Sequence, residues 1–198
     1  AGKIVLDAAY DNGSKVLKID LQASEGAEGI AASMMGLPGT PAVELTVKGE
    51  APLTDYSADL TLASDGAERL AGQVAVAMAE GGGTTFGADL DGDLAPLFLP
   101  DYAEFFGNSV QLKAEGEKAA TGELDLDSFR LVTRAMELGG SLQLAADGLP
   151  QRFDITGKLG LDGQPVLLPL TTDQRTSVTH ADLALKFDAA AGDRWTAD

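Results

Sequence analysis

The sequence predicts a mainly β protein, an antiparallel meander with one apolar face and two short helical inserts. Three observations indicate this class. Apolar and polar residues alternate along most of the chain, as in Leu60 and Leu62 against Thr61, and a period of two places one kind of side chain on each face of a strand. Short turns rich in Gly, Asp and Asn separate the alternating runs, which makes neighbouring strands antiparallel. Glycine, at 24 of 198 residues, also suits turns and kinked strands.

The strands follow one another with short connections. Residues 3–10 and 14–23 predict a hairpin, because Asn12-Gly13 lies between two alternating runs. Further alternation predicts a strand at 41–50 and three strands within 55–90. The later strands are expected at residues 109–117, 122–127, 128–133, 136–145, 152–161, 165–170 and 177–188.

The first helical insert is predicted at residues 25–35. Ser24 is the expected N-cap, and Gly36 is the expected C-terminal stop. A narrow apolar stripe at helical spacing consists of Ala27, Ile30, Ala31 and Met34. A stripe this weak requires a surface on which the helix can lie.

The second helical insert contains the densest group of large apolar side chains in the chain. Asp93 is expected to cap it, Pro100 divides it and Gly107 ends it. We predict that it forms a hydrophobic plug on the sheet, and an aromatic contact for lipid or another ligand is the alternative. The plug residues are Leu97, Phe98, Phe105 and Phe106.

Two short stretches recur in the chain. Residues 109–117 align with 42–50, and 144–148 align with 62–66. The recurrence predicts two unequal strand–helix–meander repeats, at about 1–90 and 91–198, within one β-rich segment. Internal repeats favour an extended architecture in which units stack on their neighbours. The segment is expected to be cut from a longer chain.

Composition excludes several functions. Lys and Arg number 14 against 31 Asp and Glu, for a net charge of −17. This balance argues against nucleic acid, because affinity for phosphate backbones comes mostly from basic residues. It also argues against an anionic membrane surface. The chain has no cysteine and therefore no disulfide or thiolate metal site. No apolar run is long enough for a membrane-spanning helix.

The sequence offers no catalytic or metal-binding motif. His180 is the single histidine and lies in an alternating run, so it is interpreted as an exposed strand residue. Asp89, Asp91 and Asp93 resemble half of a calcium loop, but Pro100 stands where the final glutamate is expected. No G-x-S-x-G elbow occurs. We therefore expect a protein that is not an enzyme and has no cofactor.

The apolar face is the candidate binding surface. A bare sheet would expose more apolar area than soluble monomers usually leave uncovered, so a second sheet, the helices or acyl chains must cover it. Small Ala and Gly residues on this face would leave room for acyl chains. The predicted lining residues are Leu45, Val47, Leu60, Leu62, Val74, Val76, Val110, Leu112, Leu142, Leu144, Phe153 and Ile155.

Several turn and helix-end motifs, taken in order, resemble those of a known family. They are GLPGTPA at 36–42, GEAPLTDY at 49–56, DGAERLAG at 65–72, DGDLAPL at 91–97, FFG at 105–107 and DGQPVLLPL at 162–170. This order is similar to the periplasmic β-rich region of the TamB family, the inner-membrane component of the translocation and assembly module. The resemblance covers essentially the whole chain and extends to the AsmA-like, bridge-like lipid transport proteins.

The resemblance implies a sheet curled into a U-shaped, β-taco-like hydrophobic groove in the periplasm. It implies a protein anchored in the inner membrane by a segment outside this sequence. The function implied is phospholipid transport to, and assembly of, the outer membrane, together with protein secretion. The implied partners are phospholipid acyl chains, neighbouring segments of the same long chain and an Omp85-type, TamA-like outer-membrane protein. A closed β-sandwich, an adhesin-like structural module without bound lipid, is the alternative, and a hydrolase is a third.

Overall fold

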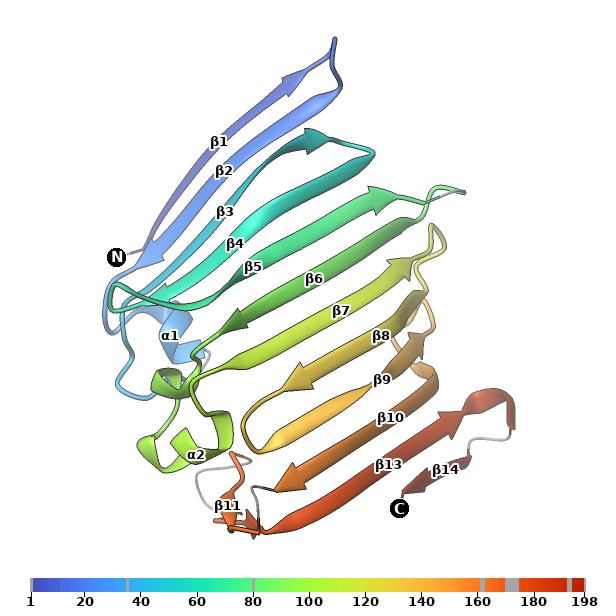
Figure 1. Ribbon diagram of the computed structural model, residues 1–198. Coiled ribbons are helices and arrows are strands. Elements are labelled where there is room, and N and C mark those ends of the chain that lie inside the picture. Colours follow the sequence, from blue (N-terminus) through green and yellow to red (C-terminus); the bar gives the residue numbers. More distant parts are fainter. Residues whose placement is uncertain are drawn as a thin grey trace.

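A computed structural model describes residues 2–34, 36–79, 81–160, 163–169, 175–191 and 194–197 of the chain. Most of these residues lie in one large antiparallel sheet (Figure 1). Its strands, in spatial order, are β1 (Lys3–Asp11), β2 (Val16–Glu25), β3 (Val43–Pro52), β4 (Asp55–Ser64), β5 (Ala67–Met78), β6 (Thr84–Gly92), β7 (Val110–Lys118), β8 (Leu124–Val132), β9 (Met136–Leu144), β10 (Pro150–Gly160), β13 (His180–Asp188) and β14 (Arg194–Ala197).

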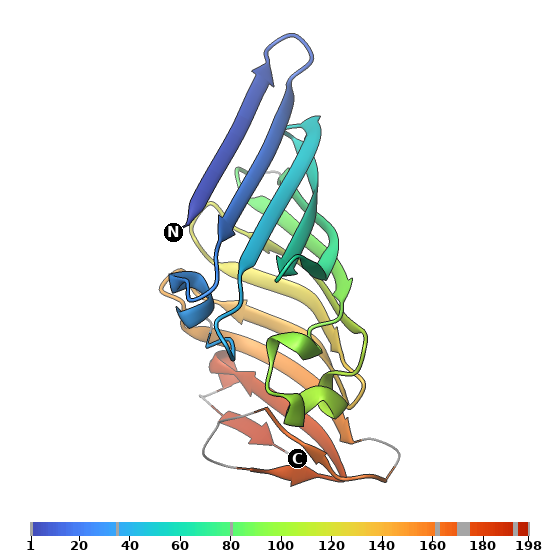
Figure 2. The same ribbon diagram turned by 90° about the vertical axis from the view of Figure 1, so that its left-hand side faces the viewer.

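The sheet is a meander, as the alternating pattern predicts, and the mainly β class is confirmed. Each strand pairs with the next one along the chain, except that β10 pairs with β13. Over the residues described, β1 and β14 are the two edges and do not pair with each other, so the sheet is not closed into a barrel. The strand direction rotates from β1 to β10 (Figure 2), which is the usual twist of a sheet.

The turns use the residues that tight connections require. Asp65 and Gly66, with φ of 49° and 74°, join β4 to β5, as expected for a two-residue hairpin turn. The first hairpin is wider than its Asn-Gly pair suggests, because Asp11 pairs with Val16 and residues 12–15 form the loop. Asp11 Oδ1 closes that loop by accepting the N–H groups of Gly13 at 2.7 Å and Ser14 at 2.8 Å.

The predicted break between residues 127 and 128 is a β-bulge inside one strand, β8. The register shifts there, so that Leu126 lies opposite Leu142 and Phe129 lies opposite Gly140. A bulge inserts an extra residue into one strand, and this insertion restores the alternation. Both halves of β8 therefore direct their apolar side chains to the same face of the sheet.

The predicted strand at 165–170 is not part of the large sheet. β11 (Val166–Leu167) pairs with β12 (Ser177–Val178) in a separate two-stranded ribbon. Pro165 and Pro169 flank β11, and a proline cannot donate a ladder hydrogen bond, which accounts for its shortness. The expected strand at 177–188 is accordingly divided into β12 and β13. The predicted strand ends at Leu161 and Leu170 lie outside the described residues.

The first insert is shorter than predicted. The helix α1 (Ile30–Met34) begins five residues later than expected, because residue 25 still belongs to β2. Ser24 lies in β2 and does not cap the helix. Instead Glu25 Oε2 accepts the Ala31 N–H at 2.6 Å, and the backbone donors of Ala31 and Ile30 lower the pKa of the Glu25 carboxyl. The predicted helix end at Met35 lies outside the described residues.

The second insert has the predicted divisions. It consists of two 3₁₀ turns and one short α-helix, η1 (Ala95–Leu97), η2 (Pro100–Tyr102) and α2 (Ala103–Phe106). Asp93 Oδ1 accepts the Ala95 N–H at 3.1 Å, Pro100 begins η2 and Gly107, with φ of 66°, follows α2. A further turn, η3 (Ala189–Ala191), follows β13. Both inserts and β11 gather on one side of the sheet, at the strand ends (Figure 1).

The boundary between the two predicted repeats lies within a continuous sheet. β6, which ends the first repeat, pairs with β7 of the second over nine consecutive residue pairs from Thr84 opposite Lys118 to Gly92 opposite Val110. In each repeat a helical insert is followed by one of the aligned strands, β3 or β7. The repeats therefore share one sheet and one apolar face.

Candidate functional site: the apolar face

The cross-strand register assembles one continuous apolar surface, which we call the apolar face. A central row crosses the sheet with each member directly opposite the next, and it consists of Leu6, Leu21, Val47, Leu60, Gly72, Leu90, Leu112, Leu131, Leu138, Gly157 and Leu183. Parallel rows lie on either side of it. All twelve predicted lining residues belong to this face by register, which places them together without testing what they bind.

Most of the apolar face is only half-buried, because a single sheet has no second layer of comparable size. Val76 is 44 % exposed, and at the β1 edge Leu6 is 61 % and Ile4 is 76 % exposed. Val110 and Leu90, at 2 % and 7 %, are among the few deeply buried members. The apolar face therefore has one buried part, around Val110 and Leu90, while its other residues remain partly exposed to solvent.

Two glycines on this face stand where a side chain would collide with the backbone of the neighbouring strand. Gly72 has a φ of 150° and a Cβ there would overlap the carbonyl oxygen of Asp89. Gly140, with φ of 157°, has the same relation to the carbonyl oxygen of Asp154. Because Gly72 faces Leu60 and Leu90 across the strands, the missing side chain also leaves a hollow between large apolar neighbours.

The second insert covers one end of the apolar face and forms the plug. Tyr102, Phe105 and Phe106 of the insert form a buried cluster with Val110 of β7, Ala135 of the β8–β9 turn and Val166 of β11. Phe98 stacks on Phe106 with ring centroids 4.1 Å apart, and Phe105 meets Phe106 edge-on at 5.1 Å. Leu131, Met136 and Leu159 of the sheet pack against this cluster. Leu97 is buried at 6 % exposure.

Polar contacts fix the plug at the β8–β9 turn. The N–H groups of Arg134 and Ala135 donate to the carbonyls of Phe106 at 3.1 Å and Phe105 at 3.2 Å. The Arg134 side chain also pairs with Glu104 at 2.6 Å. These hydrogen bonds satisfy carbonyls at the end of α2 that have no partner inside the helix, so the plug is anchored by its backbone as well as by its rings.

The first insert leaves a pocket open at the other end of the apolar face. The pocket has a volume of about 650 Å³ between α1 and strands β1 to β4. Ile30, Ala31 and Met34 of the predicted helical stripe line one side, and Ile4 and Leu45 lie among the residues of the sheet side. Ile30 and Met34 remain 72 % and 83 % exposed. The pocket is thus apolar, wide and accessible.

The opposite surface, the polar face, carries rows of polar side chains with charges of both signs. One row consists of Asp20, Lys48, Asp59, Gln73, Asp89, Lys113 and Arg130, each opposite the next. Lys48 pairs with Asp20 at 3.2 Å and Lys113 with Asp89 at 2.7 Å. Exposed ion pairs of this kind contribute only about 0–1 kcal/mol each. Their main effects are to favour this register and to keep the surface hydrated.

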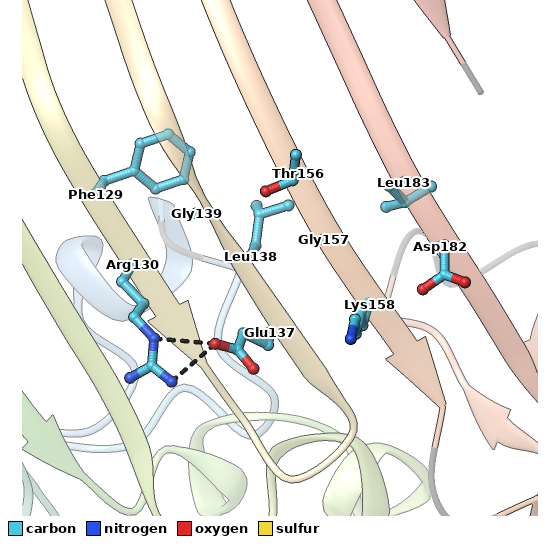
Figure 3. Close-up of a pocket in the computed structure, with 10 residues that line it drawn as sticks. All are labelled: Phe129, Arg130, Glu137, Leu138, Gly139, Thr156, Gly157, Lys158, Asp182 and Leu183. Atoms are coloured by element: carbon cyan, nitrogen blue, oxygen red, sulfur yellow. Dashed lines mark hydrogen bonds and ion pairs between the residues drawn. The ribbon is translucent and has the colours of Figure 1, made fainter.

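A shallow hollow of about 410 Å³ lies on the polar face (Figure 3). Gly139 lies between Arg130 and Thr156 in the register, which opens the hollow. Arg130 donates to Glu137 Oε1 through Nε at 3.1 Å and through its terminal nitrogen at 2.8 Å, while Lys158 extends from the next strand. These groups are charged and solvated, and the hollow presents no nucleophile beside a base.

The residues that the sequence marked as possible ligands do not assemble. His180 is exposed and its Nε2 lies 3.1 Å from Asp182 Oδ2. Asp89 pairs with Lys113, and Asp93 belongs to the start of the plug. Across the part of the chain that the structure describes, no three histidine or carboxylate side chains group as a metal site would need.

Tyr56 was not among the predicted lining residues, although it belongs to the same alternating run as Leu60 and Leu62. It lies on the apolar face opposite Val76, and its hydroxyl is shielded from solvent with no hydrogen-bond partner among the described residues. A Cβ at Gly49 would lie 2.6 Å from this hydroxyl, so the ring rests over the glycine. Burial raises the pKa of Tyr56. The Tyr56–Gly49 contact links β4 to β3, and alternation alone does not reveal it.

Tyr56→Phe is therefore expected to stabilise the protein, by up to about 1 kcal/mol, because a buried hydroxyl without a partner loses hydration for no gain. A tyrosine whose pKa is raised on folding contributes its full stability below pH about 10 and loses it as pH rises through the folded pKa. The advantage of the phenylalanine variant should thus widen above pH 10. Urea unfolding of both proteins at pH 7 and at pH 10.5 measures the difference in stability. Tyr10→Phe, on the exposed strand β1, is the control. A Tyr56→Phe variant that is less stable than wild type would contradict the prediction.

Comparison of the chain with protein-family models, with curated proteins and with solved structures finds no match. In the described residues no helix has the length and apolar character needed to cross a membrane.

Proposed function

We propose that this chain is a non-enzymatic segment whose sheet curls into a U-shaped groove that holds phospholipid acyl chains along the apolar face. One observation carries the proposal: an unbroken apolar row crosses the sheet from β1 to β13, and most of it has no second layer above it. Soluble monomers rarely leave so large an apolar surface uncovered. A ligand that is itself apolar and extended is the occupant that such a surface fits best.

The energetics favour acyl chains. Burying each CH₂ group contributes about 0.8 kcal/mol, so several methylenes against the face suffice for binding without any polar recognition. Small residues such as Gly72, Ala88 and Ala114 lie in or beside the central row and provide depth. The pocket of about 650 Å³ beside α1 is wide enough to admit a chain at the open end.

The plug divides the face functionally. Phe105 and Phe106 already occupy the ends of strands β7 to β10, so lipid would use the remainder, towards β1. The closed-sandwich alternative requires a second sheet of comparable size. Among the residues described, the second sheet is the β11–β12 ribbon of two residues per strand, which is too small to cover the face.

In the wider proposal the chain acts in the periplasm as part of a TamB-like, AsmA-like protein anchored in the inner membrane. It would help to carry phospholipid to the outer membrane and assist assembly there with a TamA-like partner. The support is the order of turn and helix-end motifs in the sequence, together with an apolar face of the kind such proteins use. The acidic polar face would keep an elongated body soluble.

The test is lipid occupancy after gentle purification. Native mass spectrometry and organic extraction should find phospholipid bound to the wild-type chain. Ala88→Trp places a large ring on the half-buried apolar face between Val74 and Ala114 and should lower occupancy severalfold. Ala75→Trp, on the exposed polar face of the adjacent strand, is the matched control and should retain lipid. A wild-type chain free of lipid, or equal loss in both variants, would sink the proposal.

A further inference from the structure

We propose that Arg69 is a headgroup site at the rim of the apolar face, where its guanidinium binds the phosphate of a phospholipid whose acyl chain lies in the adjoining pocket. This inference rests on the proposed function and adds a polar contact at a fixed place. Acyl chains alone suffice for binding, and Arg69 would favour the lipids that carry a phosphate.

A β-bulge sets Arg69 apart from the regular alternation of β5. Leu70 lies opposite Leu62, whereas Glu68 lies opposite Ala63, so Arg69 is the extra residue between the two pairs. Bulges re-aim a side chain and are over-represented beside functional sites. The direction of Arg69 therefore depends on the bulge and not on the alternation that assigns other residues of β5 to a face.

Ser64 holds the guanidinium at the end of the apolar face. Arg69 Nε donates to Ser64 Oγ at 2.8 Å, and a terminal nitrogen of Arg69 lies 3.5 Å from the Ser64 carbonyl oxygen. Ser64 lies opposite Val43, two residues beyond Leu62 on the same face of β4, and is only 3 % exposed. Val43 and Leu62 both line the pocket of about 650 Å³ beside α1. The charged group is therefore next to the apolar pocket.

The backbone around Arg69 is fixed on two sides. Asp65 Oδ1 accepts the Ala42 N–H, and the Asp65 N–H donates to the Ala42 carbonyl, both at 3.0 Å. These bonds join the β4–β5 turn to the end of the segment that contains α1. On the other side, a Cβ at Gly92 of β6 would collide with the carbonyl oxygen of Arg69. A site fixed in this way loses little conformational freedom on binding.

Arg69 is a cation without an anionic partner in the described part of the chain. Eight of the 14 lysines and arginines form ion pairs there, and Arg69 is not one of them. Arg69 is nevertheless partly buried, and a charge removed from water favours a partner. Its planar fork has five N–H donors, a geometry that matches phosphate oxygens, and the contacts with Ser64 leave donors free.

The arginine and the pocket match the two parts of a phospholipid. Charge-assisted hydrogen bonds to phosphate are about twice as strong as neutral ones, and the apolar lining of the pocket accepts the chain. All phospholipid headgroups share the phosphate, so Arg69 would separate phospholipids from uncharged lipids. The net charge of −17 opposes anions at long range, but at 0.15 M salt the screening length is about 8 Å, so the nearby cation has the larger effect.

Equilibrium binding of two lipids with the same acyl chain tests the headgroup site. Lauroyl lysophosphatidic acid and monolauroylglycerol differ only in the phosphate, and calorimetric titration below their critical micelle concentrations gives both dissociation constants. Wild type should bind the phosphorylated lipid about tenfold more tightly. Arg69→Gln should remove this preference and leave the affinity for monolauroylglycerol unchanged. Equal binding of both lipids by wild type overturns the headgroup site while the proposed function stands, and binding of neither overturns both.

Three controls separate a phosphate site from a general effect of charge. Lys48→Gln removes one positive charge from the polar face, where Lys48 pairs with Asp20, and should keep the preference; a loss as large as that of Arg69→Gln overturns the site. Arg69→Lys retains the charge without the planar fork and should keep part of the preference. Inorganic phosphate alone should compete only weakly with the phosphorylated lipid. Full displacement at equal concentration would identify a site for free phosphate and overturn the headgroup assignment.

Ile30→Asn tests whether the acyl chain of the same ligand lies in the pocket. Ile30 lines the pocket and is 72 % exposed, so the fold should tolerate the change. It should weaken binding of both lipids by the same factor, whereas Arg69→Gln should act on the phosphorylated lipid alone. If Arg69→Gln instead weakens both lipids and lowers the melting temperature, Arg69 only supports the bulge and the proposal is wrong. Unchanged binding of both lipids by Ile30→Asn would overturn the placement of the chain.

Discussion

Replacing Phe105 or Phe106 by alanine is expected to lower the free energy of unfolding by about 3–5 kcal/mol for each residue. Both rings are buried, at 5 % and 8 % exposure, in the cluster that joins the plug to the apolar face. Truncation removes the contact of each ring with the other and opens a cavity beneath the plug. The backbone hydrogen bonds to Arg134 and Ala135 limit how far the segment can collapse to fill that cavity.

Urea unfolding of each single variant measures this effect. Leu99→Ala in the same insert is the control, because Leu99 is 37 % exposed and its truncation should cost less than about 1 kcal/mol. Phe105→Leu provides a milder change in case the alanine variant does not fold. Losses no larger than that of Leu99→Ala would show that the plug does not hold the sheet.

Bound lipid, measured on the same variants, distinguishes the two roles of the plug. If the rings only cover the sheet, their removal should destabilise the protein and leave more of the apolar face open to lipid. If they contact lipid directly, the fold should survive and lipid occupancy should fall. The buried positions of Phe105 and Phe106 favour the first outcome.

Val74→Asp is expected to cost about 2–4 kcal/mol of unfolding free energy and to abolish lipid uptake, because it places an unpaired carboxylate among apolar neighbours. Val74 lies between Ala58 and Ala88 on adjacent strands, with no cation in that row. Leu60→Asp and Leu112→Asp should behave in the same way. Thermal denaturation and native mass spectrometry report the two effects separately.

Ala75→Asp is the matched control for this change. It adds the same carboxylate one residue further along β5, on the exposed polar face, opposite Ser57 and Gly87. Position 75 is preferred to Gln73 as the control because Gln73 lies between Asp59 and Asp89, where a new carboxylate would add repulsion between like charges. The control should remain within about 0.5 kcal/mol of wild type. Equal damage from Val74→Asp and Ala75→Asp would mean that the assignment of faces is wrong.

The face of each strand was predictable because it depends on local alternation. Leu60, Val74 and Leu112 share the apolar face in the structure, since a period of two projects side chains to opposite sides wherever the chain is extended. Pro100 and Gly107 also act locally: Pro100 divides the second insert and Gly107 ends it, as expected. The bulge in β8 was harder, since Asp127-Ser128 resembles a turn until the register of β9 shows that the strand continues.

The sequence by itself determined a mainly β meander, two helical inserts and the division into an apolar and a polar face, because each rests on contacts within a few residues. Only the tertiary structure decided that the strands form one large open sheet, that Val166 and Ala135 complete the plug, and that β11 leaves the sheet. These features depend on which distant segments meet. Val166 contacts the plug from more than fifty residues away, and the spacing of apolar residues within a strand carries no information about such a partner.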